Sequence, residues 1–161
     1  MENVQVSSFS LAIFSVYTNI LIEIEHVRSI ELIEVYTDGA TNEKLGVSGA
    51  GVYIKVNGQT YEYSYSLPKM SNHEAEFTAV LKALEICEEK FPNEILSFQT
   101  DSQIVVNAIE KSYVKNALFK PLLTEIMEKA ATFPYLFIKW IPSKQNLHAD
   151  RLAKKAIYMQ K

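Results

Sequence analysis

The stretch Glu34-Val35-Tyr36-Thr37-Asp38-Gly39-Ala40 places a carboxylate and a glycine directly after a strand-like alternation of side chains. The pattern predicts a first strand over residues 32–37, with Asp38 at its end. Because an unpaired charge is costly to bury, an acid at the end of a buried strand is a poor core residue. We therefore predict that Asp38 is the hub of a metal site, to which later elements bring three further carboxylates.

Composition narrows the class of protein. At 161 residues, with 48% apolar and 22% charged residues, the chain can form one globular domain with a real core. Cys87 is the only cysteine, which excludes an intramolecular disulfide and indicates a reducing cytoplasm. The three histidines are scattered along the sequence, so they are a poor set of ligands for a zinc site. The net charge of −3 argues against a strongly basic nucleic-acid binder, so any phosphate recognition must be local.

Residues 1–30 differ in their pattern of apolar residues from the domain predicted over residues 31–161. The mostly apolar run from Phe9 to Ile24 predicts an amphipathic accessory helix, which we expect to pack on the domain or, in a homodimer, on a second subunit. The run is short for a membrane span, and no lysine or arginine precedes it as in a secretory signal, so no membrane partner is expected. A membrane or targeting role and an upstream start codon are the alternatives.

The next segments predict an antiparallel meander. Asn57-Gly58 suits a type I′ turn, and it joins two runs, 52–56 and 59–65, that are rich in β-branched and aromatic residues. Gly49-Ala50-Gly51 allows close backbone approach at the start of the second strand. A phosphate cradle is the rival interpretation of these glycines, but the Walker lysine pattern is missing.

A long helix is predicted from Asn72 to Lys90. Ser71 and Glu74 have the spacing of a capping box, and Pro92 follows the end. Glu76 lies on the same stripe as the apolar positions of this helix, whereas its other glutamates can lie on a solvated face. A hydrogen-bonded buried glutamate and a functional one are equally compatible with this pattern.

Asp101 repeats the arrangement of Asp38, because it follows a predicted strand over residues 95–100. The alternative role is a helix N-cap, since a helix is predicted to begin at Ser102. If the two strands are neighbours, both acids project at the same edge of the sheet.

The last part of the chain predicts a helix, a strand and a final helix. A helix is expected over residues 121–131, and the nearly continuous apolar run Tyr135 to Ile141 predicts a strand covered on both faces. After a loop over residues 142–146, the final helix carries Asp150 in its first turns, where the helix dipole favours an anion. An exposed acid that only complements this dipole is the alternative for Asp150.

Taken together, five segments resemble the type 1 ribonuclease H family, over about residues 31–158. They are Tyr36-Thr37-Asp38-Gly39-Ala40, Gly49-Ala50-Gly51, Ser71-Asn72-His73-Glu74-Ala75-Glu76, Thr100-Asp101-Ser102-Gln103 and Asn146-Leu147-His148-Ala149-Asp150-Arg151-Leu152-Ala153. The resemblance implies an α/β, ribonuclease H-like fold, with a five-stranded mixed sheet of three antiparallel and then two parallel strands, flanked by helices.

The activity implied by the resemblance is that of an endoribonuclease. It hydrolyses the RNA strand of RNA–DNA hybrids with two Mg²⁺ ions, Mn²⁺ being a substitute, and leaves 5′-phosphomonoesters. Asp38 would bridge the two ions, Glu76 and Asp101 would complete the first site, and Asp150 would hold the second. Four crowded carboxylates repel one another, so we expect raised pKa values in the metal-free site.

The resemblance also implies which residues contact the hybrid. Ser71 and Asn72 occupy positions that the family uses for nucleic-acid contacts, and Gly39, Ala40 and Gln103 are expected beside the scissile phosphate.

Two family features are missing. The loop over residues 142–146 has no histidine, and residues 111–121 have lysines but no basic cluster, which predicts weaker binding with a shallower salt dependence. The alternatives are a nuclease with another nucleic-acid substrate and a non-catalytic binding or assembly module.

Overall fold

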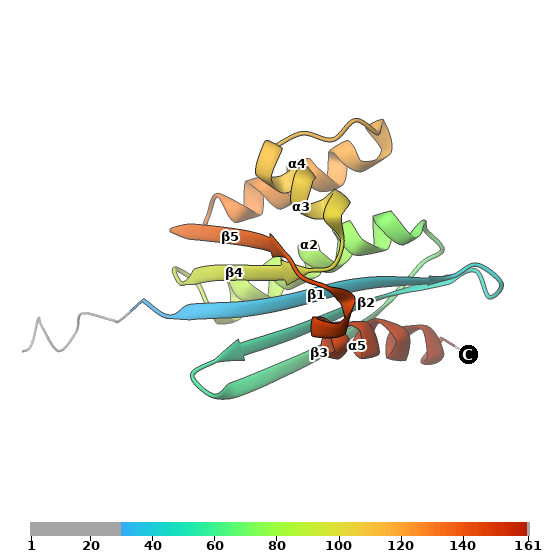
Figure 1. The fold of residues 1–161 in the computed structure, drawn as a ribbon, viewed down its shortest axis with the longest axis horizontal. Coiled ribbons are helices and arrows are strands. Elements are labelled where there is room, and N and C mark those ends of the chain that lie inside the picture. Colours follow the sequence, from blue (N-terminus) through green and yellow to red (C-terminus); the bar gives the residue numbers. More distant parts are fainter. Residues whose placement is uncertain (1–29, 161) are drawn as a thin grey trace, which may run out of the picture. The chain divides into compact units, whose positions relative to one another are not determined.

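The computed structural model describes residues 30–160, and its domain is a five-stranded mixed sheet flanked by helices (Figure 1). The strands are β1 (Leu32–Asn42), β2 (Val47–Val56), β3 (Gln59–Leu67), β4 (Ile95–Thr100) and β5 (Tyr135–Trp140). The helices are α2 (Asn72–Lys90), α3 (Gln103–Lys111), α4 (Lys120–Ala130) and α5 (Leu147–Tyr158), with short 3-10 helices η1 (Ala117–Phe119) and η2 (Ser143–Gln145). The predicted fold class is confirmed; the accessory helix expected in residues 1–30 lies outside the described residues.

The order of the sheet is β3-β2-β1-β4-β5. β1, β2 and β3 pair antiparallel, whereas β4 pairs parallel with β1 and with β5, as predicted. The β2–β3 connection has φ of 48° at Asn57 and 76° at Gly58, which are the positive values that a type I′ turn requires. Within the described residues, no helix is long and apolar enough to cross a membrane.

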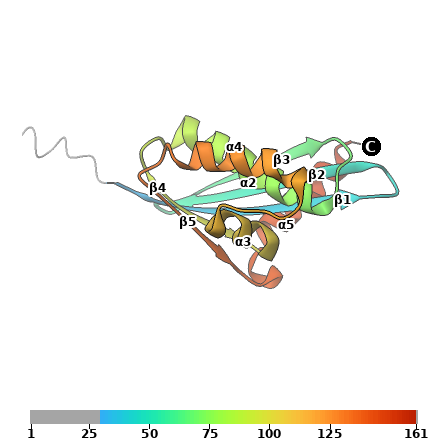
Figure 2. The same cartoon turned by 90° about the horizontal axis from the view of Figure 1, so that it is seen from above.

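The helices cover the two faces of the sheet differently. α2 packs on β1, β2 and α4, and Figure 2 shows α2 and α4 running side by side. α5 packs on β1, β2 and β3 from the other side. Ile33, Val35, Phe77 and Phe98 belong to the main core, with at most 1% of their surface exposed. Burial of this apolar surface is the main source of stability of the domain.

Two glycine positions let helices approach the sheet closely. A methyl group on Gly39 would overlap the backbone of α2 at Ala75, and one on Gly51 would overlap the carbonyl oxygen of Ala149 in α5. The close approach predicted for Gly49-Ala50-Gly51 is therefore seen, and its cause is helix packing.

Two boundary predictions were wrong. β1 continues to Asn42, so Asp38 lies inside the strand and not at its end. The run after Thr37 stays extended because it continues to pair with β2. β5 is an edge strand and is not covered on both faces: Tyr135 is 62% exposed and Phe137 58%. A continuous apolar run does not distinguish a central strand from an edge strand with apolar solvent-facing residues.

Candidate active site

Asp38 lies just beyond the point where β1 stops pairing with β4. The last β1–β4 pair is Tyr36 with Gln99, two positions before Asp38, while pairing with β2 continues and sets Asp38 opposite Gly51. Residues that oppose one another in an antiparallel pair share a face of the sheet. Gly51 lies against α5, so Asp38 is on the face of the sheet that α5 covers, beyond the end of the β1–β4 pairing.

Glu76 approaches from the first turns of α2. The predicted capping box forms, with Ser71 as N-cap and Glu74 reaching back to the backbone, and this fixes where the helix begins. The Glu76 side chain is only 13% exposed, as its position on the apolar stripe predicted. It accepts hydrogen bonds from Asn72 Nδ2 at 2.9 Å and from the Ser102 hydroxyl, and His73 Nδ1 lies 3.1 Å away.

Asp101 is not a helix cap in this structure. The N-cap position of α3 is occupied by Ser102, whose side chain makes no capping hydrogen bond. The carboxylate of Asp101 instead accepts a hydrogen bond from Asn146 Nδ2 at 2.8 Å, and its backbone carbonyl accepts one from Trp140 Nε1 at 3.0 Å. Contacts from the last residue of β5 and from the β5–α5 connection therefore hold Asp101 directly after β4.

Asp150 lies in the first turn of α5, as predicted. Its carboxylate accepts a hydrogen bond from Lys154 Nζ at 2.8 Å, and the side chain is 36% exposed. The close contact of Gly51 with Ala149 sets this end of α5 directly over β2, next to Asp38 in the sheet.

The electrostatics of Asp38 link it to the other three acids. Burial is the largest cause of a pKa raised to about 8, and repulsion from Asp101, Asp150 and Glu76 adds to it in that order. A hydrogen bond from the Gly39 backbone opposes the shift. The other three predicted acids are therefore all within electrostatic reach of Asp38, and its raised pKa agrees with the expected crowding.

The chemistry of this cluster fits a hard cation. Carboxylate oxygens are the ligands that Mg²⁺ prefers, and an excess of negative charge at Asp38 is what a divalent ion would neutralise. As the side chains lie, no three acidic, histidine or cysteine groups of the described residues form a closed ligand set. Glu76 and Asp150 are engaged by protein donors, so they would have to turn to bind a metal.

Sequence reasoning missed the role of Asn146. This side chain is 1% exposed, and its Nδ2 donates to the Thr37 carbonyl at 2.9 Å as well as to Asp101. It therefore joins the backbone beside Asp38 to a second acid. Its Oδ1 is buried without a hydrogen-bond partner among the described residues. Asparagine before a helix predicts a cap, but Asn146 makes no side-chain cap bond, and the only signal was its place in the motif before Asp150.

The predicted contact residues surround the acids unequally. Ser71, Asn72 and Gln103 are exposed at the N-terminal ends of α2 and α3. Gly39 is buried against α2, so only its backbone is available, and Ala40 is partly exposed in β1. All five lie within a few residues of an acid of the cluster.

The described loop between β5 and α5 has no histidine; its middle forms η2. His148 is the second residue of α5, and its ring stacks on Tyr53 with centroids 4.3 Å apart. His148 is therefore a residue of the helix start and not of the loop before it.

Comparison with known proteins identifies the family. A family model described as reverse transcriptase-like matches residues 36–156. A ribonuclease H of Desulforamulus reducens is 30% identical over 144 residues, which cover 80% of this chain and 89% of that protein. The chain belongs to the ribonuclease H family. It is therefore a ribonuclease H-like nuclease, as the sequence predicted.

One further relative has a different name, and two solved structures have the same fold. A protein of Enterococcus faecalis named "Putative hydrolase EbsB" is 38% identical over 128 residues, 78% of this chain and 94% of that one. The structure of LC11-RNase H1 in complex with an RNA/DNA hybrid is 29% identical, covers 80% of this chain and 98% of that one, and has a TM-score of 0.73. The ribonuclease H1 of Halobacterium salinarum, at 23% identity and a TM-score of 0.73, covers 78% of this chain and 97% of that one and shows the shared fold.

Proposed function

We propose that this ribonuclease H-like protein is a metal-dependent endoribonuclease that hydrolyses the RNA strand of RNA–DNA hybrids and leaves 5′-phosphate ends. The observation that carries the proposal is the coupling of Asp38 to Asp101, Asp150 and Glu76, which come from three other elements. A family member with this acid cluster has the groups needed to bind cations at a scissile phosphate. The structure of LC11-RNase H1 with a hybrid supports the choice of substrate.

In this proposal Asp38, Glu76, Asp101 and Asp150 hold two Mg²⁺ ions, which when bound activate water and offset charge on the attacking and leaving oxygens. The residues of the chain position these acids. Asn146 fixes Asp101 relative to β1, and the Ser102 hydroxyl holds one oxygen of Glu76. Lys154 Nζ donates a hydrogen bond to the Asp150 carboxylate and would compete with a bound ion for it.

Recognition of the RNA strand would depend on polar groups at the helix starts. Asn72 connects the surface to the site, because its side chain is exposed and its amide donates to Glu76. Ser71 and Gln103 are exposed nearby. Hydroxyl and amide side chains can pair with the 2′-hydroxyls that mark RNA in the minor groove. The backbone at Gly39 and Ala40 would approach the phosphate.

The test is cleavage of an end-labelled RNA–DNA hybrid in Mg²⁺ and in Mn²⁺ by the protein and by Asp38→Asn. We expect cleavage inside the RNA strand, 5′-phosphate products and loss of both in the variant. A folded protein that turns over the hybrid with neither metal would contradict the proposal. A panel with double-stranded RNA, double-stranded DNA and single strands tests the alternative that the same site serves another substrate.

A further inference from the structure

The outer edge of β5 differs from an ordinary exposed strand. Among the described residues no strand pairs with this edge, and Lys139 is the only charged residue of Tyr135–Trp140. Tyr135 and Phe137 lie on the same face of the strand, are 62% and 58% exposed, and stack with ring centroids 6.3 Å apart. Proteins usually protect free edges with charge, proline or a bulge.

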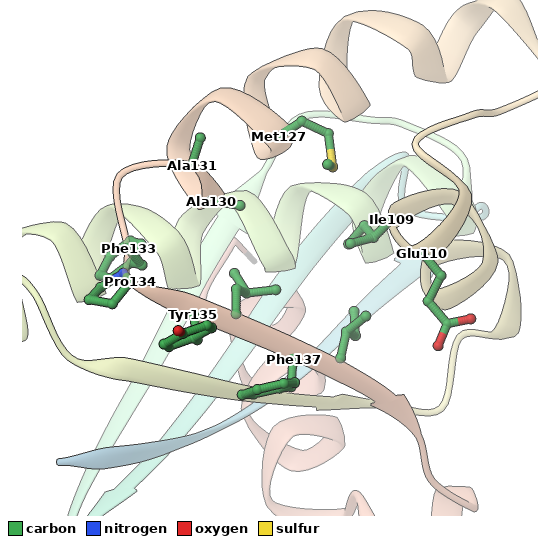
Figure 3. Close-up of a pocket in the computed structure, with 11 residues that line it drawn as sticks. Ile109, Glu110, Met127, Ala130, Ala131, Phe133, Pro134, Tyr135 and Phe137 are labelled. Atoms are coloured by element: carbon green, nitrogen blue, oxygen red, sulfur yellow. The ribbon is translucent and has the colours of Figure 1, made fainter. Parts of the chain in front are cut away.

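The same strand borders an apolar groove, which Tyr135 and Phe137 also line (Figure 3). Leu136 and Ile138 line it together with Ile109 of α3 and Met127 of α4, and its volume is about 520 Å³. Glu110 is the single charged lining residue. The free edge therefore has apolar side chains on both faces, and a strand added to it would bury both sets.

We propose that β5 is a self-pairing edge, at which two copies of this chain join antiparallel to form one continuous sheet. This goes beyond the nuclease function and does not depend on it. A two-fold axis perpendicular to the sheet keeps each face in register, so residues on the aromatic face meet the aromatic face of the partner.

The register follows from the side chains. With Phe137 on the axis, Leu136 faces the partner's Ile138 at the groove, and Tyr135 faces the partner's Lys139. An ammonium group over a tyrosine ring is favourable, and it gives the one charge of the strand a partner in each copy. Opposed aromatic and aliphatic pairs are the contacts that stabilise antiparallel strands.

The exposed aromatic side chains supply part of the area that a dimer interface needs. Tyr135, Phe137 and Trp140 are 62%, 58% and 47% exposed. At roughly 200 Å² for a fully exposed aromatic side chain, they leave about 350 Å² to bury per copy. A standard interface buries about 800 Å² per partner, and the strand backbone and the groove would supply the rest.

The opposite edge of the sheet shows why β5 is the pairing edge. β3 alternates polar residues on one face, and Glu62 forms an ion pair with Arg151 of α5. The Ser66 hydroxyl donates to the Ala156 carbonyl, so α5 also holds this edge. Charge and helix contacts make β3 a protected edge, whereas β5 has a single charged residue, Lys139.

The first test is the mass of the full chain by sedimentation equilibrium over a range of protein concentrations. We expect a reversible monomer–dimer equilibrium that Phe137→Lys weakens about 100-fold or more, because it sets two like charges opposite one another. Leu45→Lys, in the β1–β2 turn at 49% exposure, is the matched control and should leave the dimer unchanged. A wild-type chain that stays monomeric, or a dimer that Phe137→Lys leaves intact, would overturn the proposal.

Cysteine pairs test the register. Phe137→Cys should form a disulfide-linked dimer on mild oxidation, whereas Tyr135→Cys and Lys139→Cys should cross-link only when the two variants are mixed. The native thiol does not compete, since Cys87 is buried and its pKa is raised to about 12. Cross-linking of Tyr135→Cys with itself at the rate of Phe137→Cys would contradict this register.

Discussion

The acids of the site fall into two pairs that the fold holds in different ways. Asp38 and Asp101 belong to the sheet: one lies inside β1, and the other directly follows β4 and accepts hydrogen bonds from Asn146 and Trp140. Glu76 and Asp150 belong to helices and rest on side-chain partners, Ser102 in one case and Lys154 in the other. Asp38 and Asp101 therefore define the position of the site, whereas Glu76 and Asp150 are able to adjust to what binds there.

The sharpest test of this contrast is Asp38→Asn. The amide keeps the shape of the side chain but removes the central charge, so hybrid cleavage should fall on the order of 10³-fold or more. The matched measurement is Asp150→Asn, for which we expect a smaller loss that added Mn²⁺ partly restores. Equal losses in both variants, with unchanged circular dichroism, would remove the distinction between the pairs.

The same residue predicts how stability depends on pH. The pKa of Asp38 is raised from 3.8 to about 8, so the folded state favours the protonated carboxyl. Its stabilising contribution is complete below pH 3.8 and is lost as the pH rises through about 8. In chelator, denaturant unfolding should show a decrease on the order of a few kcal/mol over this window.

Asp38→Asn should flatten that decrease and be the more stable protein at pH 8. Saturating Mg²⁺ should also restore stability at that pH by mass action. If the wild-type protein and the variant have parallel pH profiles, Asp38 is not the group that titrates.

Asn146→Ala tests what holds the two acids of the sheet, Asp38 and Asp101, in place. It removes the hydrogen bonds to Thr37 and Asp101, so we expect a 10- to 100-fold loss of activity, the range seen when an outer contact of a metal ligand is removed. Loss of buried hydrogen bonds should also lower stability by about 1–3 kcal/mol. Gln145→Ala, at the exposed neighbouring position, is the control, and a weaker apparent Mg²⁺ affinity distinguishes misplacement of Asp101 from simple destabilisation.

The smallest effect is expected for Lys154→Ala, which should strengthen Mg²⁺ binding and not weaken it. Lys154→Ala frees the Asp150 carboxylate and removes a positive charge, so calorimetry should show Mg²⁺ binding about 2- to 5-fold more tightly, as suits a partly exposed ion pair. Lys155→Ala, at the next exposed position, should have no such effect. Weaker Mg²⁺ binding in Lys154→Ala would indicate that Lys154 holds Asp150 in place and is not its competitor.

The parts that the sequence predicted are those in which local pattern and tertiary structure agree. The Asn57-Gly58 turn, the Ser71 capping box and the buried stripe that contains Glu76 follow from backbone preference and helical periodicity, and all three are in the structure. The mixed sheet, with three antiparallel and then two parallel strands, was implied by the resemblance of the five segments, and it is also in the structure.

The parts that failed depend on contacts distant in sequence. The length of β1 beyond Thr37 is set by pairing with β2, and the exposure of β5 is set by its place at the edge of the sheet. Asn146 is 109 positions from Thr37, whose carbonyl accepts its hydrogen bond, so the local sequence around Asn146 did not predict this role. Long-range hydrogen bonds leave no periodic trace along the chain.

The acid cluster contains residues from both the first strand and the final helix of the domain. During synthesis, Asp38 emerges from the ribosome more than a hundred residues before Asp150, and Gly51 receives α5 only after the rest of the sheet is made. A growing chain can thus acquire most of its architecture while its set of acids is incomplete. Under the proposed mechanism, the full set of four acids arrives only with α5, so a nascent chain that lacks this helix would cleave hybrids more slowly than the full chain.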